Sequence, residues 1–95
     1  MMEQYYIIRA DRAGVFFGKI KDRTGNEVTL TDARRIWHWE GAFSLSQLAM
    51  EGTKKPQGCK FTMKVDEITV LGVIEIIKST PEATQNILEV PVWKI

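Results

Sequence analysis

The densest group of side chains able to bind a ligand lies at residues 34–39, which read Arg-Arg-Ile-Trp-His-Trp. Arginine presents a planar set of hydrogen-bond donors that matches a phosphate, and tryptophan presents a flat face on which a nucleobase can stack. Alternate side chains of a strand lie about 7 Å apart on one face, so one nucleotide could touch an indole and a guanidinium together. In a strand the two faces would carry Arg35, Trp37 and Trp39 on one side and Arg34, Ile36 and His38 on the other. The pattern predicts a nucleotide-binding face, and it is also typical of a strand whose tryptophans are simply core.

Two neighbouring segments could complete such a site. Residues 43–48 carry a capping box, with Ser44 at the N-cap and Gln47 three residues later, which predicts a short helix over Leu45–Glu51. The start of a helix favours an anion, although capping competes for Ser44 and Gln47, and the basic loop after the helix could close over a ligand or simply be solvated. The candidate ligand-binding residues are therefore Arg34, Arg35, Trp37, His38, Trp39, Ser44, Ser46, Gln47, Lys54 and Lys55.

The sequence offers little for catalysis. His38 is its only histidine and Cys59 its only cysteine, and no motif around either supports a nucleophile and its base. A zinc site needs three or four nitrogen or sulfur ligands, and no phosphate-binding glycine loop is present. A single cysteine cannot form an intrachain disulfide. We expect no enzymatic activity, no metal site and no cofactor.

Charge is balanced overall but unevenly distributed. The formal net charge is +1, which argues against a strongly basic protein that binds long nucleic acid. Residues 9–35 hold seven basic and four acidic side chains, whereas residues 65–95 hold two basic and five acidic ones. The sequence has no apolar run of 18 residues and no signal-peptide pattern. We expect no contact with a membrane and a cytoplasmic location.

The elements that must position these residues are mostly strands. We predict one domain over residues 1–95, of the α+β class, with a mostly antiparallel sheet and two short helices. The second helix should begin at Pro81, with Thr80 as its cap, and run to about Leu88. The strand ending at Ile77, the second helix and the last strand could form a crossover unit, in which the two strands are parallel. The predicted strands cover residues 5–10, 15–20, 27–30, 33–39, 60–65, 68–77 with a bend at Gly72, and 91–95.

Several motifs together resemble a family of short, uncharacterised phage and prophage proteins. They are Ala-Gly-Val-Phe-Phe-Gly at 13–18, Arg-Arg-Ile-Trp-x-Trp at 34–39, Ser-Leu-Ser-Gln-Leu at 44–48 and Pro-Val-Trp at 91–93. His38 stands where that family often has Tyr. The resemblance implies a viral sponge, which binds a cyclic nucleotide second messenger of bacterial immunity, such as those of CBASS or Thoeris, and holds it without cleavage. A cyclic di- or trinucleotide or a cyclic ADP-ribose-type molecule, met in the host cytoplasm, is the implied ligand.

Tight binding by so small a chain favours an oligomer. A nanomolar affinity corresponds to about 12 kcal/mol, whereas two stacked bases supply about 2–6 kcal/mol and two phosphate contacts about 3–6 kcal/mol, a sum at or below that target before ordering costs are subtracted. We therefore expect a homo-oligomer, which is a dimer, a tetramer or a larger assembly, with pockets between subunits. A small structural or accessory phage protein and a single-strand nucleic-acid-binding module remain as the other interpretations.

Overall fold

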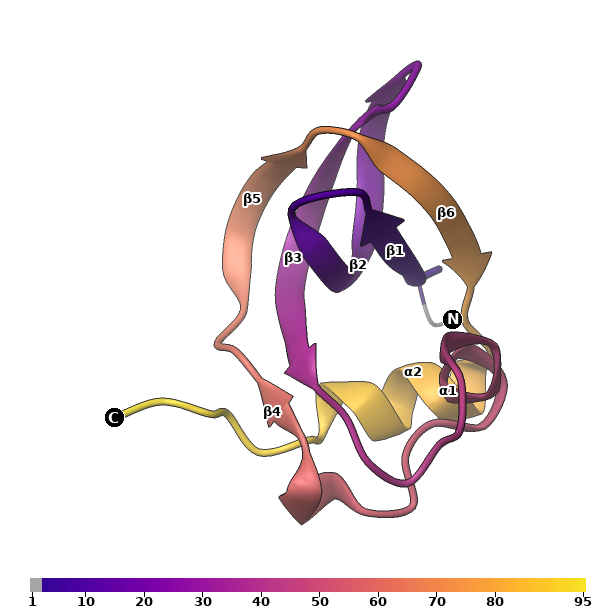
Figure 1. Ribbon diagram of the computed structural model, residues 1–95, viewed down its shortest axis with the longest axis vertical. Coiled ribbons are helices and arrows are strands. Elements are labelled where there is room, and N and C mark those ends of the chain that lie inside the picture. Colours follow the sequence, from indigo (N-terminus) through magenta and orange to yellow (C-terminus); the bar gives the residue numbers. More distant parts are fainter. Residues whose placement is uncertain (1–2) are drawn as a thin grey trace.

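The computed structural model describes residues 3–95, and a six-stranded antiparallel sheet forms its centre (Figure 1). The α+β class is confirmed: two short helices cover one face of this sheet. No helix among residues 3–95 is long and apolar enough to cross a membrane. The strands are β1 (Tyr6–Ala10), β2 (Gly14–Thr24), β3 (Glu27–His38), β4 (Lys60–Phe61), β5 (Val65–Val70) and β6 (Val73–Lys78), and the helices are α1 (Leu45–Glu51), the short 3-10 helix η1 (Pro56–Gly58) and α2 (Pro81–Leu88).

Strands β1, β2 and β3 form the predicted meander. Two strands were expected over residues 27–39, but β3 is continuous. Asp32 takes a φ of 49° at a register shift between β2 and β3, which is the geometry of a β-bulge. The bulge changes the alternation of the faces, so that Leu30 and Ala33 point into the same hydrophobic cluster.

The predicted long strand over residues 68–77 is divided at Gly72 into β5 and β6. Gly72 has a φ of 73°, a conformation that glycine adopts at little cost. The bend sends β5 to pair with β3 and β6 to pair with β1, so the two strands arch across the meander from one edge to the other (Figure 1). Two hydrogen bonds of 2.9 Å hold the arch, from Asp11 N to the Gly72 carbonyl and from Val73 N to the Asn26 carbonyl.

Consecutive residues of each strand point to opposite faces of the sheet, and this gives the protein two cores. The helix-side cluster contains Ile7 and Phe17 together with Leu48 of α1 and Ile87 of α2. The arch-side cluster contains their sequence neighbours Ile8 and Phe16 and, from the arch, Val70 and Val73. Each face of the meander is therefore buried under a different cover.

Both helices begin where the sequence predicts. The Ser44 hydroxyl accepts a hydrogen bond from Gln47 N at 3.1 Å, and the Thr80 hydroxyl accepts one from Ala83 N at 3.0 Å. These caps satisfy donors that the first turn of a helix leaves without partners.

The last predicted strand is wrong, because residues 91–95 form no ladder. Val92 makes one isolated parallel bridge to Phe61, so the chain returns beside β4 and the crossover to a neighbour of β6 does not form. Hydrogen bonds explain the path: Trp93 N donates to the Phe61 carbonyl at 2.9 Å, and Arg34 donates to the Pro91 carbonyl at 3.4 Å. Strand β4 is also shorter than the predicted strand over residues 60–65, because Thr62 leaves the ladder and its hydroxyl accepts from Arg35 N.

Candidate functional site

Arg35 extends from β3 on the arch side, and its side chain remains free. Its guanidinium carbon lies 4.8 Å from the ring centroid of Phe16, a distance at which a cation is attracted to an aromatic face. No residue among 3–95 accepts a side-chain hydrogen bond from it or forms an ion pair with it. The side-chain donors of Arg35 are therefore unused by the described residues, and its role in binding a ligand stays a prediction.

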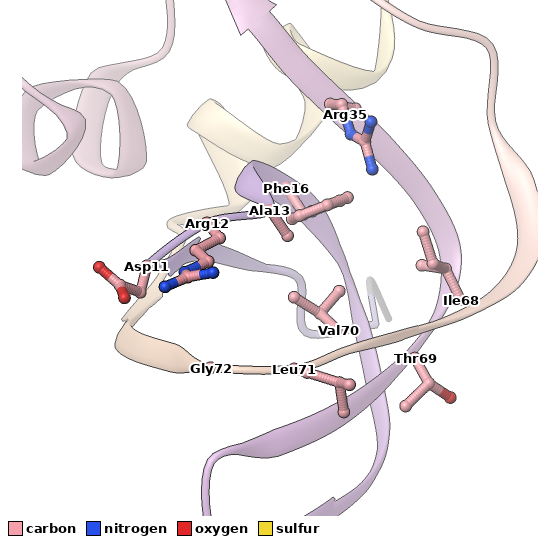
Figure 2. Close-up of a pocket in the computed structure, with 10 residues that line it drawn as sticks. All are labelled: Asp11, Arg12, Ala13, Phe16, Arg35, Ile68, Thr69, Val70, Leu71 and Gly72. Atoms are coloured by element: carbon pink, nitrogen blue, oxygen red, sulfur yellow. The ribbon is translucent and has the colours of Figure 1, made fainter.

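A cleft of about 540 Å³ opens beside Arg35 (Figure 2). It lies between the β1–β2 turn, which carries Arg12, and the segment of the arch around Gly72. A smaller cavity of about 180 Å³ extends it toward Met63 and shares Phe16 and Arg35. The residues that line the larger cleft are Asp11, Arg12, Ala13, Phe16, Arg35, Ile68, Thr69, Val70, Leu71 and Gly72.

The arginines of the described chain divide into two groups. Three donate to the protein itself: Arg9 to Glu75 at 3.0 Å, Arg23 to the Gly25 carbonyl at 3.2 Å, and Arg34 to backbone carbonyls. The other two, Arg12 and Arg35, have no side-chain acceptor among residues 3–95. Both line the same cleft, so the free guanidinium donors of the described chain are gathered around one apolar hollow.

A family match covers residues 3–87 of the chain. The protein belongs to the family described as "Domain of unknown function (DUF6948)". The matched range contains the whole cleft, from Asp11 to Gly72, and ends within α2. No curated protein and no solved structure matches the chain.

In this DUF6948 protein, Arg34 is not available to a ligand, which corrects our expectation for this residue. Its side chain is 3% exposed and lies on the face opposite Arg35. Burial lowers the pKa of its guanidinium from the ordinary value. Five backbone carbonyls accept from its nitrogens, those of Phe61, Thr62, Ile87, Val90 and Pro91, at distances of 2.8–3.4 Å. Arg34 is a structural clamp, because it has no donor left for a phosphate.

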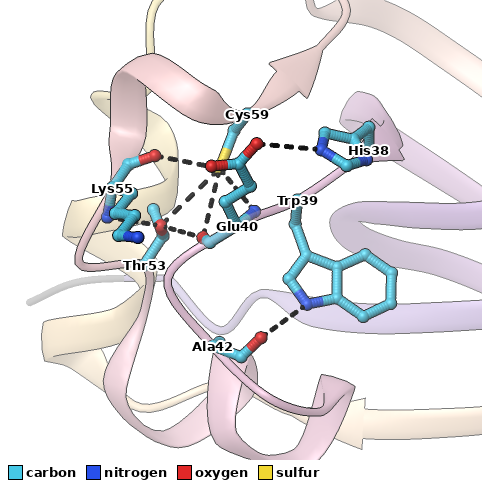
Figure 3. Close-up of polar contacts among 7 residues, drawn as sticks. All are labelled: His38, Trp39, Glu40, Ala42, Thr53, Lys55 and Cys59. Atoms are coloured by element: carbon cyan, nitrogen blue, oxygen red, sulfur yellow. Dashed lines mark hydrogen bonds and ion pairs between the residues drawn. The ribbon is translucent and has the colours of Figure 1, made fainter.

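Trp37 and Trp39 do not share a ligand face. Trp39 follows the end of β3, packs against the helix-side cluster and donates from Nε1 to the Ala42 carbonyl at 3.1 Å (Figure 3). Trp37 points to solvent and stacks beside Trp93. The expected alternation of side chains between the two faces stops here for two reasons. The register between β3 and β4 shifts after Ile36, and β3 ends at His38.

His38 belongs to a group of polar contacts around Glu40 (Figure 3). Its Nε2 lies 3.3 Å from the Glu40 carboxylate. The buried Cys59 thiol accepts from Glu40 N at 3.5 Å, and the Thr53 hydroxyl donates to the Glu40 carbonyl. Among the described residues, the hydrogen-bond partners of Cys59 are backbone groups and the Thr53 hydroxyl. The contacts therefore tie the loops before α1 and after it together, and they do not pair the thiol with the imidazole.

The predicted polar residues around α1 occupy a different place from the cleft. Ser44 is used as a cap, and Gln47 accepts from Phe43 N at 2.8 Å. A cavity of about 290 Å³ there is lined in part by Gln47, Lys54 and Lys55, but it shares no residue with the cleft at Arg35. Ser46 lies on α1 and lines neither. The candidate residues are thus brought to separate sites.

The sequence did not identify Arg12 or the residues of the arch as part of a binding site. Arg12 belongs to the basic excess of residues 9–35, which is the one signal that points to it. The arch residues join the cleft only because β5 crosses to β3 while β6 returns to β1. Among residues 3–95, no group of three or more histidine, cysteine and carboxylate side chains is placed to hold a metal ion.

Proposed function

We propose that this protein binds and sequesters a small nucleotide in the cleft beside Arg35. The ligand we favour is a cyclic di- or trinucleotide of bacterial immune signalling. A phage protein that binds it in the host cytoplasm would keep it from its immune effector. The observation that carries the proposal is that Arg12 and Arg35, whose guanidiniums have no acceptor among residues 3–95, line one apolar cleft. The resemblance to phage and prophage proteins supports the biological setting.

The chemistry of the cleft suits such a ligand. Hydrogen bonds from an ionised donor to a phosphate are roughly twice as strong as neutral ones. Ala13, Ile68 and Leu71 supply carbon surface for a base or a ribose, and Asp11 is the one carboxylate among the lining residues. A volume of about 540 Å³ is within the range of roughly 300–1,000 Å³ that is usual for small-molecule sites.

The lining residues favour holding a ligand over cleaving it. They include no histidine, cysteine or serine, so the cleft holds no histidine base beside a serine or cysteine nucleophile. We therefore propose sequestration without reaction.

A second subunit would complete the site. The cleft is open to solvent, and Leu71 at its edge is 64% exposed. Covering the ligand from a second side would strengthen each polar contact, because water would be excluded. We therefore propose a homo-oligomer, with two or four copies of the chain around shared ligands.

A thermal-shift panel tests the proposal directly. The panel contains cyclic dinucleotides, cyclic trinucleotides and cyclic ADP-ribose isomers, with linear ATP as a control. A ligand that binds only the folded protein raises the melting temperature. Chromatography after heat release should then return the ligand intact. If no nucleotide raises the melting temperature, the proposed function is wrong, and recovery of cleaved products would indicate an enzyme.

A further inference from the structure

Two exposed indoles lie side by side, one near the end of β3 and one in the segment that follows α2. The ring centroids of Trp37 and Trp93 are 6.3 Å apart, and the ring planes differ by 11°. Trp37 is 64% exposed and Trp93 is 47% exposed. Tryptophan is a residue that folded proteins usually bury to a large extent, so two parallel indoles left in solvent form a platform with free ring surface.

Positive charge flanks this platform. The Lys60 ammonium lies 5.5 Å from the ring centroid of Trp93. Arg35, whose guanidinium is free, lies two residues before Trp37 on β3, and the buried Ile36 alternates between them. Cations beside aromatic rings are the arrangement that grooves for single-stranded nucleic acid use, with rings for bases and cations for phosphates.

The platform is held in place before any ligand arrives. Trp93 N donates to the Phe61 carbonyl at 2.9 Å, and Val92 forms a bridge to the same residue. The Arg34 clamp holds the carbonyls of Val90 and Pro91 just before it. An ordered aromatic surface loses little conformational freedom when a base stacks on it.

The platform is close to the proposed nucleotide cleft. Trp37 lies two residues after Arg35 on β3. The smaller cavity of about 180 Å³, lined by Arg35, Thr62 and Met63, lies beside the same stretch of β3. A ligand whose phosphate is bound by Arg35 could therefore place one base in the cleft and direct a second toward Trp37.

We infer that Trp37 and Trp93 form a stacking site for a second nucleobase, so that the ligand carries at least two bases joined by phosphate. This inference rests on the proposed function, because it assigns the cleft at Arg35 to the first nucleotide. It selects a cyclic dinucleotide or a larger cyclic oligonucleotide over a cyclic mononucleotide or a single ADP-ribose unit.

The test compares ligands of one base and two bases on matched variants. Calorimetric titrations use cyclic di-adenylate, cyclic di-guanylate and mixed cyclic adenylate-guanylate, together with the 3′,5′-cyclic mononucleotides. The variants are Trp37→Leu, Trp93→Leu and, as a control on the helix side, Trp39→Phe. Because stacking on an aromatic residue contributes about 1–3 kcal/mol per base, Trp37→Leu should weaken dinucleotide binding about 5- to 150-fold and leave mononucleotide binding within 2-fold.

Fluorescence gives a second measurement that does not depend on the leucine variants. In the Trp39→Phe protein only Trp37 and Trp93 remain as indoles, so a bound dinucleotide should quench the emission strongly and a mononucleotide weakly. If the dinucleotides bind Trp37→Leu as tightly as the parent and cause no quenching, the inference is wrong while the proposed function stands. If no nucleotide binds the parent protein, both are wrong. A third outcome is that light scattering shows a dimer, that Trp37→Leu dissociates this dimer, and that nucleotides cause no quenching. In that case the platform binds a second copy of the chain, and the inference is wrong.

Discussion

The guanidinium of Arg34 donates from Nη1 to the Ile87 carbonyl at 2.9 Å and thereby joins β3 to the last turn of α2. The same nitrogen reaches the Val90 carbonyl at 2.9 Å. The end of a helix leaves carbonyls without intrahelical partners and carries a partial negative charge. A buried cation is placed here against carbonyl dipoles instead of a carboxylate.

Replacing Arg34 should therefore destabilise the fold far more than replacing its neighbour. We expect Arg34→Ala to lower the free energy of unfolding by about 3 kcal/mol or more, because several buried carbonyls lose their donor. Arg35→Ala is the matched control, since it removes the same side chain from the exposed face, and it should change the stability by about 0.5 kcal/mol or less. Urea unfolding followed by circular dichroism measures both. Equal losses would contradict the assignment of Arg34 as the clamp.

These neighbouring arginines also show which structural features the sequence can predict and which it cannot. Strand alternation correctly separates Arg34 and Arg35 onto two faces, and it puts Arg34 with the apolar Ile36. It cannot show that five carbonyls from β4, α2 and their flanking residues converge on Arg34, because those contacts join residues far apart in the chain. The sequence therefore predicts the strand but assigns both arginines to the ligand.

A close approach between Gly52 and Asn86 should make Gly52 hard to replace. Gly52 has φ 78° and ψ −165°, a region that is essentially restricted to glycine, and an added Cβ would lie 2.5 Å from Asn86 Oδ1. Asn86 in turn exchanges hydrogen bonds of 2.8 and 2.9 Å with the backbone of Thr53. We expect Gly52→Ala to destabilise the protein by roughly 3 kcal/mol, from backbone strain and the disturbed pairing of Asn86.

Gly25 is the control for that experiment. It also has a positive φ, 59°, but an added Cβ would meet nothing within 4 Å. Gly25→Ala should cost only about 1 kcal/mol, the ordinary penalty of a left-handed alanine. Thermal unfolding of the two variants compares them, and a larger loss for Gly25→Ala would show that the contact with Asn86 is unimportant.

The ion pair between Lys19 and Asp32 should give the protein a measurable acid dependence. Lys19 Nζ lies 2.8 Å from Asp32 Oδ2, and this hydrogen bond lowers the pKa of the Asp32 carboxyl. A carboxyl with a lowered folded-state pKa stabilises the protein above its unfolded pKa. That contribution is lost in the acid range, as the pH falls from the unfolded pKa of the carboxyl through the lower folded value.

Asp32→Asn removes this titration while keeping a side chain that tolerates a positive φ. We expect its stability to depend less steeply on pH than that of the parent over the same acid range, as measured by urea unfolding at several pH values. Asp66→Asn is the control, because Asp66 makes no ion pair with residues 3–95. An unchanged slope in Asp32→Asn would show that the pair does not contribute.

The candidate site could be predicted only in part. The chemistry of Arg35 and Trp37 is visible in the sequence, since both lie in one dense segment of arginine and tryptophan. The residues that lie beside them cannot be identified from the sequence. Arg12 reaches the cleft through the β1–β2 turn, and Trp93 lies beside Trp37 because the chain after α2 turns back to Phe61. Long-range pairing of strands, which local patterns do not specify, decides which side chains share a surface.

The central claim is that Arg12 and Arg35 together bind a nucleotide, and titration calorimetry of single variants tests it most directly. Arg12→Ala, Arg35→Ala and the control Arg23→Ala each remove one positive charge, but only the first two change the cleft. With the cyclic nucleotide that gives the largest thermal shift, we expect each cleft variant to bind at least about 10-fold more weakly, because a hydrogen bond to a charged group contributes about 1.5–3 kcal/mol. Arg23→Ala should stay within 2-fold of the parent. Unchanged affinity in both cleft variants would contradict the account.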